Sequence, residues 1–283
     1  MLIVFAAVLA GAVLYLFLIA PARLAGGDNP SLCTHYAHRG LHGGAIPENS
    51  LAAFRAAADA GYGIELDIRL SADGEVVVFH DDHLARMTGV QAEVSACTAE
   101  ALSGLYLYDA DGKTTQERIP TLREVLDAVG GRVPLLIELK GESADTALCP
   151  AADAILAGYN GVYCVESFNP LLLAWYKKHR RHVLRGQLYT DVFREKRPTL
   201  LPLLLSFMVT NVLSRPHFIA YDKRYAHALP VLLTTKWMAA PGFVWTVRTE
   251  EEYAEAARLR RPVPTKTIFE SIAPNGEERS AGI

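Results

Sequence analysis

The sequence lacks any pair of closely spaced cysteines. Its four cysteines, Cys33, Cys97, Cys149 and Cys164, lie far apart, and no Cys-x-x-Cys motif occurs. This spacing excludes a thiolate zinc site of the usual kind and a dense disulfide scaffold. We interpret them as ordinary, mostly buried thiols in a reduced compartment, with a pairing of two across the fold as the alternative.

The chain also lacks an excess of positive charge, internal repeats and low-complexity tracts. Its formal net charge is −3 at pH 7 over 283 residues. A nucleic-acid partner is therefore not expected, because phosphate backbones bind through clustered Lys and Arg. Nothing divides the chain into two units, and α/β barrels often run past about 200 residues as single domains.

Charged residues are missing between Leu2 and Ala20. As a helix this stretch would be about 29 Å long, which matches a bilayer core of about 30 Å. We predict that residues 1–25 form a retained transmembrane anchor, a single pass in the cell membrane. The alternative is a cleaved signal peptide, because small residues follow the apolar run; its length and the lack of a preceding Lys or Arg favour the anchor.

The flanks of this segment indicate its orientation and the domain limits. Arg23 and Arg39 follow the segment and no basic residue precedes it, which favours a cytoplasmic catalytic domain. Residues 26–33 contain Gly-Gly-Asp-Asn-Pro and are predicted as a linker. The folded domain is then expected at 34–272, and residues 273–283 as a flexible tail.

Short apolar runs alternate with helical patterns through the rest of the chain. Eight runs are predicted as strands: His35–His38, Gly63–Arg69, Leu135–Lys140, Val162–Glu166, Val183–Tyr189, His217–Tyr221, Phe243–Val247 and Lys266–Phe269. Helices are predicted between them: Ser50–Ala60, Thr121–Val129, Ala144–Leu156, Pro170–His179, Leu200–Leu213, Arg224–Leu233 and Thr249–Arg260. This alternation predicts a (β/α)8 TIM barrel, with a doubly wound open sheet as the alternative.

Two segments depart from the regular alternation. Glu75–His80 is predicted as an additional short strand, and residues 82–120 as an insertion that shapes one wall of the site. Leu200–Leu213 is strongly apolar but contains Pro202, and as a helix it would cover only about 21 Å. We favour a buried barrel helix there over a segment that dips into the membrane.

Ionisable residues stand in pairs on two of the predicted strands. Glu65 and Asp67 are two residues apart, so their side chains leave the same face of one strand. Glu138 and Lys140 have the same spacing on an otherwise apolar strand, where unpaired charges would be costly. The three carboxylates suit Mg²⁺ or Ca²⁺ better than zinc, with an internal salt bridge as the structural alternative for each pair.

Two histidines stand at predicted strand ends beside these pairs. His38 precedes Arg39, whose planar guanidinium suits a phosphate. His80 is followed by Asp81 and Asp82, either of which would orient it. His35 and His42 belong to no such constellation and are interpreted as structural.

At these residues the chain resembles the glycerophosphodiester phosphodiesterase family. The motifs are Ala37-His38-Arg39-Gly40, Pro47-Glu48-Asn49-Ser50, Ile64-Glu65-Leu66-Asp67, Val78-Phe79-His80-Asp81-Asp82 and Ile137-Glu138-Leu139-Lys140. Their order and spacing match the family throughout. Ser167-Phe168-Asn169-Pro170 and Val244-Trp245-Thr246-Val247 resemble its later strand ends, so the likeness covers residues 34–272.

The resemblance implies a role for each matching residue. His38 and His80 would be the general base and general acid in an order left open, and Arg39 and Lys140 would contact the phosphate. The cation, Mg²⁺ or Ca²⁺, would be held by Glu65, Asp67 and Glu138. Glu48 and Asp81 would support the site, and Trp245 would line the pocket against the glycerol or lipid portion.

Three positions depart from the family pattern. Glu166 stands where Gln is common and adds a negative charge beside the expected cation site. Arg248 replaces a frequent Asn, and Thr267-Ile268-Phe269-Glu270 replaces the usual Thr-Asp-containing last strand. These changes bear on metal affinity and on substrate choice.

The expected function is metal-dependent hydrolysis of glycerophosphodiesters to glycerol phosphate and an alcohol, in phospholipid metabolism. One alternative is a lysophospholipase D or phospholipase-type enzyme on membrane lipids, which the apolar segments favour. Another is a noncatalytic membrane protein that binds a phosphorylated ligand, although no motif histidine or acidic ligand is missing. The expected partners are a small diester or lysophospholipid and the membrane, without nucleic acid.

Overall fold

Eight parallel strands close into a barrel in the computed structural model, which describes residues 1–24, 29–141, 143–195, 199–259 and 265–270. The barrel strands are β1 (Tyr36–Ala37), β2 (Gly63–Leu70), β6 (Leu135–Leu139), β7 (Tyr163–Ser167), β8 (Arg185–Tyr189), β9 (Phe218–Asp222), β10 (Gly242–Val247) and β11 (Thr265–Phe269). Strand β1 pairs with both β2 and β11, and this contact closes the sheet. The closure confirms the predicted TIM barrel and excludes the open sheet.

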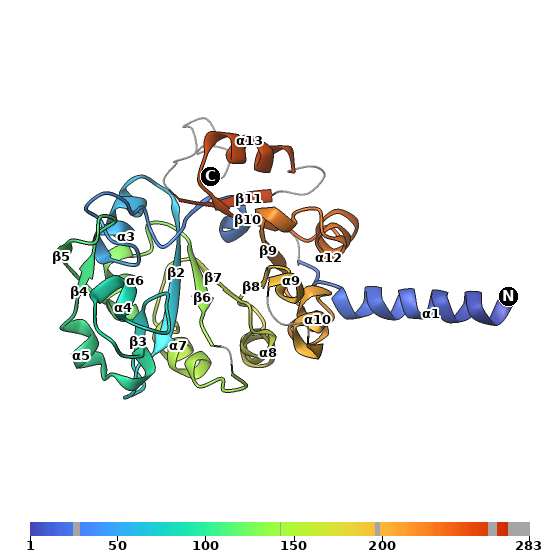
Figure 1. Ribbon diagram of the computed structural model, residues 1–283, viewed down its shortest axis with the longest axis horizontal. Coiled ribbons are helices and arrows are strands. Elements are labelled where there is room, and N and C mark those ends of the chain that lie inside the picture. Colours follow the sequence, from blue (N-terminus) through green and yellow to red (C-terminus); the bar gives the residue numbers. More distant parts are fainter. Residues whose placement is uncertain (25–28, 142, 196–198, 260–264, 271–283) are drawn as a thin grey trace.

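Helices connect successive strands and cover the outside of the barrel (Figure 1). The longer ones are α3 (Leu51–Asp59), α6 (Leu122–Val129), α7 (Leu148–Leu156), α8 (Pro170–His179) and α13 (Glu250–Arg258). Ser50 caps α3, because its side chain accepts a hydrogen bond from the Ala53 amide. Thr121 and Glu124 form a capping box on α6.

The predicted insertion forms a compact subdomain beside β2. Strand β3 (Val76–Val78) pairs antiparallel with β2. It is followed by α4 (Ala85–Thr88), η1 (Val94–Ala96), α5 (Ala99–Ser103) and the hairpin strands β4 (Tyr106–Tyr108) and β5 (Thr114–Arg118). The insertion has its own core around Phe79, Leu84 and Leu102, so it is a folded unit rather than an irregular loop.

Short helices fill the two connections around β9. The first contains α9 (Val192–Glu195), α10 (Leu200–Ser206) and α11 (Asn211–Ser214), and the second contains η2 (Lys223–Tyr225), α12 (Leu229–Leu232) and η3 (Leu233–Trp237). The prediction of one buried helix over 200–213 is wrong. The segment is two helices separated by Phe207–Thr210, and several of its leucines are exposed.

The barrel interior is closed at one end by aromatic side chains. The Tyr36 and Phe243 rings lie 5.6 Å apart, and the Phe218 and Phe243 rings lie 5.2 Å apart. Gly186 makes room for this layer, since a Cβ atom there would lie 1.9 Å from the Phe218 ring. The histidines and carboxylates of the candidate site lie toward the other end, where the strands finish.

The amino-terminal helix α1 (Leu2–Ile19) extends away from the barrel (Figure 1). It has a mean hydropathy of 2.9 and is long and apolar enough to cross a membrane. Only its end packs on the domain, with Ile19 buried. The segment expected as a linker includes α2 (Pro30–Cys33), in which Leu32 is buried, and the expected tail lies outside the described residues.

Candidate active site

A row of carboxylates crosses three neighbouring strands at the open end of the barrel. In the parallel register Asp67 lies opposite Glu138, and Glu138 lies opposite Glu166. Adjacent strands are about 4.8 Å apart, so these side chains are direct neighbours. Glu65, Asp67 and Glu138 each offer an oxygen within 4.8 Å of the others, and all three residues are buried. The predicted cation ligands therefore come together.

The turn after β1 holds Glu65 in place. The backbone amide of Arg39 donates a hydrogen bond to Glu65 Oε2 at 2.8 Å. Arg39 has a φ of 54° and Gly40 a φ of 80°. A Cβ atom at Gly40 would lie 2.8 Å from Ala53 Cβ, so this turn passes too close to α3 for a larger residue. The His-Arg-Gly motif thus positions a backbone donor as well as its side chains.

Lys140 lies between two of the carboxylates. Its Nζ is 2.9 Å from Asp67 Oδ1 and 2.8 Å from Glu138 Oε1. Burial alone would raise the pKa of Asp67, but the charges of Lys140, His80 and Arg39 outweigh burial and hold this pKa well below its usual range. The same two carboxylates raise the pKa of Lys140, although burial opposes them. Lys140 is therefore a charged, fixed ammonium at the edge of the carboxylate cluster.

For the other carboxylates of the cluster, neighbouring positive charges do not offset the effect of burial on the pKa. Burial raises the pKa of Glu138 to about 7, even though Lys140 opposes this shift. Burial, together with neighbouring carboxylates, raises the pKa values of Glu65 and Glu166 well above the usual range. Glu166 Oε2 is buried and has no hydrogen-bond partner within the described ranges. Four buried carboxylates beside the charges of Arg39 and Lys140 leave a negative excess that fits a divalent cation.

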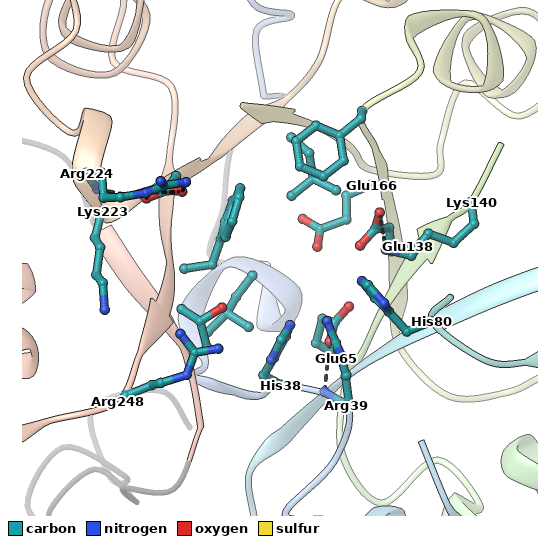
Figure 2. Close-up of a pocket in the computed structure, with 16 residues that line it drawn as sticks. His38, Arg39, Glu65, His80, Glu138, Lys140, Glu166, Lys223, Arg224 and Arg248 are labelled. Atoms are coloured by element: carbon teal, nitrogen blue, oxygen red, sulfur yellow. Dashed lines mark hydrogen bonds and ion pairs between the residues drawn. The ribbon is translucent and has the colours of Figure 1, made fainter. Parts of the chain in front are cut away.

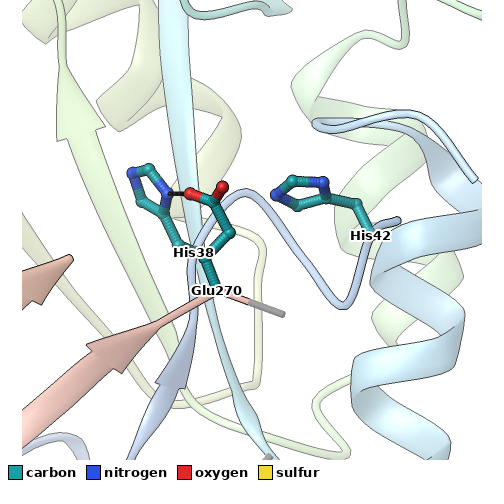
Figure 3. A group of neighbouring side chains, drawn as sticks. All are labelled: His38, His42 and Glu270. Carbon is teal, nitrogen blue, oxygen red and sulfur yellow. Dashed lines mark hydrogen bonds and ion pairs between the residues drawn. The ribbon is translucent and has the colours of Figure 1, made fainter. Parts of the chain in front are cut away.

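His38 is oriented by a residue from the last strand. Its Nδ1 is 2.9 Å from Glu270 Oε2 (Figure 3), and Arg248 Nη2 is 3.1 Å from the same oxygen. Burial lowers the pKa of His38 to about 4, while the hydrogen bond with Glu270 opposes this shift. His38 is therefore a neutral imidazole at pH 7, and its Nδ1 is engaged by Glu270. Two positions that depart from the family pattern, Arg248 and Glu270, are partners of each other.

His42 joins this group, contrary to its interpretation as a residue outside any constellation. His38, His42 and Glu270 each place a nitrogen or oxygen within 4.8 Å of the others, and Figure 3 shows the His42 ring directed toward Glu270. His35 is structural as predicted, with Nδ1 2.7 Å from the Thr267 hydroxyl. Only His42 of these two extends the polar surroundings of His38.

His80 is held by Asp81, one of the two candidates for its orientation. Its Nδ1 is 2.6 Å from Asp81 Oδ1. Arg69 donates to the His80 carbonyl oxygen at 2.9 Å and also pairs with Asp82, which fixes the loop. Burial lowers the pKa of His80 while Asp81 opposes this shift. The side chain of His80 is more exposed than that of His38, at 32% against 15%.

Arg86 links the two predicted supporting carboxylates. It donates to Asp81 Oδ2 and to Glu48 Oε1, each at 2.6 Å. Glu48 also accepts a hydrogen bond from Arg39 Nη1 at 2.8 Å. A continuous polar chain therefore joins His80 to Arg39 through the insertion. Arg86 was not among the predicted residues, because nothing in its local sequence connects it to the motifs.

The side chains surround a pocket of about 380 Å³. Figure 2 shows the histidines and carboxylates on one side of it and the cationic residues Lys223, Arg224 and Arg248 on the other. Trp245 and Phe168 form an apolar wall, with ring centroids 5.8 Å apart in an edge-to-face arrangement. The pocket thus combines a charged floor with an aromatic side.

Most of the predicted site residues line this one pocket. Those that do are His38, Arg39, Glu65, His80, Glu138, Lys140, Glu166 and Trp245. Asp67, Glu48 and Asp81 stand behind them through the contacts described above. The prediction missed Arg86, His42 and the lining residues Lys223 and Arg224, as well as the pairing of Arg248 with Glu270.

Comparisons with known proteins agree with this geometry. Residues 38–264 match the glycerophosphoryl diester phosphodiesterase family. A putative glycerophosphodiester phosphodiesterase of Bacillus subtilis is 42% identical over 114 residues, which is 40% of this chain and 46% of that protein. A glycerophosphodiester phosphodiesterase of Caldanaerobacter subterraneus is 36% identical over 162 residues, or 54% of this chain and 65% of that protein.

Solved structures show the same fold. A phosphodiesterase of Oleispira antarctica in complex with the product sn-glycerol-3-phosphate superposes with a TM-score of 0.65 at 22% identity, over 83% of this chain and 91% of that one. The alignments with the two bacterial relatives span less than two thirds of each relative's length, at 46% and 65%. The family match, in contrast, runs from His38 through the last helix of the barrel. The chain belongs to the glycerophosphoryl diester phosphodiesterase family.

Proposed function

We propose that the pocket hydrolyses glycerophosphodiesters to glycerol phosphate and an alcohol, in phospholipid metabolism. The observation that carries this proposal is the placement of two carboxylate-oriented histidines beside three clustered carboxylates. Diester cleavage needs a proton acceptor, a proton donor and neutralisation of the phosphate charge. Each requirement has a candidate group in one pocket.

Glu65, Asp67 and Glu138 are the proposed ligands of one divalent cation, Mg²⁺ or Ca²⁺. Their oxygens suit a hard cation, and the partnerless oxygen of Glu166 leaves a further negative group beside them. When bound, the cation would neutralise phosphate charge and polarise a nonbridging oxygen. Lys140 holds two of the proposed ligands, Asp67 and Glu138, in place through its ion pairs with both.

His38 is the proposed general base and His80 the proposed general acid. His38 is the more deeply buried ring, and its pKa near 4 leaves the imidazole free to accept a proton at neutral pH. It would take the proton of the attacking hydroxyl. Attack by water gives glycerol phosphate directly, whereas attack by the substrate's own glycerol hydroxyl gives a cyclic glycerol phosphate that a water must then open. The more exposed His80 keeps a proton more readily and would give it to the leaving alkoxide.

The remaining lining groups would bind the substrate. Arg39 and Lys140 are charged at neutral pH and border the carboxylate cluster, which suits the phosphate oxygens. Trp245 and Phe168 offer an aromatic surface for the glycerol or lipid portion. Glu48 and Asp81 would act by positioning Arg39 and His80.

Helix α1 is the proposed membrane anchor of this enzyme. Its length and hydropathy of 2.9 suit a bilayer span, and a signal sequence at this end would satisfy the same criteria. The basic residue Arg23 follows it, which favours a cytoplasmic barrel. An anchored barrel would also suit a lysophospholipase D activity on membrane lipids, which is the second candidate function.

The test uses the full-length chain purified in detergent. With millimolar Mg²⁺ or Ca²⁺ it should release choline from glycerophosphocholine, and a chelator should abolish the release. Turnover of a lysophospholipid alone would assign the second candidate. Binding of either substrate without turnover, in both cations, would instead support the noncatalytic alternative and contradict the enzyme.

A further inference from the structure

An apolar patch lies on α10, on α11 and on the turn between them. It consists of five side chains that are 36–70% exposed: Leu200, Leu201, Leu203, Phe207 and Leu213. No Asp, Glu, Lys or Arg occurs from Thr199 to Ser214. Scattered apolar residues are common on protein surfaces, but a charge-free segment that exposes five large ones is typical of an interaction surface.

This patch is fixed to the end of α1. The Tyr15 hydroxyl donates to the Phe207 carbonyl oxygen at 3.2 Å, and Asn211 Nδ2 donates to the Ile19 carbonyl oxygen at 3.2 Å. Arg215 donates to the carbonyl oxygens of Phe17 and Ala20 at 2.6 and 3.0 Å. Helix α1 is therefore docked on α11 at several points rather than tethered by a loose linker.

The length of α1 determines where a bilayer would lie. Its 18 residues span about 27 Å, slightly less than a hydrocarbon core of about 30 Å. If α1 crosses a bilayer, the hydrocarbon core must therefore extend to the last turn of α1, because the whole helix is needed to span it. Since Tyr15 and Ile19 in the last turns touch Phe207 and Asn211, the bilayer surface would also reach α10 and α11.

We propose that the α10–α11 patch is a lipid-contacting surface that sits in the same membrane leaflet as the end of α1. Lipid acyl chains would cover its leucines, and Arg215 would mark the level of the polar headgroups. The occupant is lipid rather than a second protein copy, because any bilayer around α1 covers the patch by geometry. This inference rests on the proposed membrane placement of α1 and is independent of the catalytic proposal.

The test is photo-crosslinking of the unmodified full-length protein in phosphatidylcholine vesicles. The vesicles contain a phosphatidylcholine with a photoactivatable group on one acyl chain, and the adducts are mapped by mass spectrometry. We expect adducts on α1 and on peptides that contain residues 199–214. Peptides of the insertion, such as those of α5, serve as an internal control and should carry none.

Three results would overturn the proposal. Adducts on α1 alone would place the anchor in the bilayer but the patch outside it. A dimer in detergent, detected by light scattering and dissociated by Leu200→Asp with Leu201→Asp, would assign the patch to self-association. An absence of lipid adducts on either segment would remove α1 from the membrane. None of these results bears on diester hydrolysis, which is assayed separately in detergent.

A charged variant and a matched control sharpen the assignment. Leu200→Asp with Leu201→Asp should lower the lipid adducts on residues 199–214 severalfold and leave those on α1 unchanged. Val90→Asp changes an exposed apolar residue in the insertion, where Val90 is 37% exposed, and should have no effect. Circular dichroism and hydrolysis of a soluble diester in detergent should match the wild type. Undiminished adducts in the folded double variant would contradict the proposal.

Discussion

The contact between His38 and Glu270 gives the sharpest prediction for catalysis. Glu270→Gln keeps an oxygen that accepts the Nδ1 hydrogen of His38 but removes the negative charge. Hydrogen bonds to charged groups contribute about 1.5–3 kcal/mol, and every 1.4 kcal/mol is about a factor of ten. The glutamine would retain a neutral hydrogen bond worth about 0.5–1.5 kcal/mol, so the change removes about 1–1.5 kcal/mol of the 2.9 Å contact, and we expect a loss of about 5- to 13-fold in kcat/KM for glycerophosphocholine.

The pH dependence separates this effect from a general loss of structure. The hydrogen bond with Glu270 raises the pKa of His38 against the larger effect of burial, which leaves it at about 4. Without the carboxylate charge this pKa should fall further, so the base stays deprotonated to lower pH. The acidic limb of the kcat/KM profile should therefore move to lower pH while the plateau falls.

Two further variants serve as controls in the same assay. Glu270→Ala removes the hydrogen bond as well as the charge and should be worse than Glu270→Gln. Arg248→Ala removes the second partner of Glu270 but leaves His38 in contact, and should cost less than either. An activity of Glu270→Gln within twofold of the wild type, with an unmoved acidic limb, would refute the positioning role of Glu270.

The remaining predictions concern the cation, the insertion and the barrel interior. Burial raises the pKa of Glu138 to about 7 in the cation-free protein, so protons compete with the cation below that pH. Calorimetry should therefore show that the affinity for Mg²⁺ or Ca²⁺ rises from about pH 5.5 to about pH 8 and that binding releases protons. An affinity that does not change with pH would contradict this. Arg86→Ala should lower kcat/KM by up to about tenfold without loss of folding, because it loosens two positioning carboxylates; unchanged kinetics would leave Arg86 a surface residue. Gly186→Ala should lower stability to urea by about 1–3 kcal/mol, since its Cβ would overlap the Phe218 ring, and an unchanged urea midpoint would show that the ring moves freely.

The barrel was predictable because its signals are local and repeated. Most strands are short apolar runs, and several of the helices that connect them begin at a capping residue, such as Ser50 or Thr121. The carboxylate cluster was predictable for the same reason. Residues two apart on one strand share a face, and parallel strands end at the same edge, so Glu65, Asp67 and Glu138 had to be close.

Contacts that depend on long side chains or on chain closure were not predictable. Arg86 lies in an insertion without periodicity and reaches Glu48, which is 38 residues away. The pairing of Arg248 with Glu270 arises only when the last strand closes on β1. In the sequence, Arg248 and Glu270 stand only as separate departures from the family pattern, and the three-dimensional structure makes them partners.

The prediction of one buried helix over 200–213 was wrong for a different reason. Its apolar residues have no helical period, so composition suggested burial where the structure exposes the leucines. Composition alone does not distinguish a buried protein core from a surface that lipid would cover. The contact between α1 and α11 is the observation from which we infer a lipid-covered surface.

The central claim is cation-dependent diester hydrolysis by His38 and His80. Phosphorus NMR of glycerophosphocholine, incubated with the full-length protein and Mg²⁺ or Ca²⁺, tests it most directly. We predict that the diester resonance is replaced by that of glycerol phosphate, and that a chelator, His38→Ala or His80→Ala each prevents this in a protein that remains folded. An unchanged diester resonance with the wild type in both cations, or full turnover by either histidine variant, would contradict the claim.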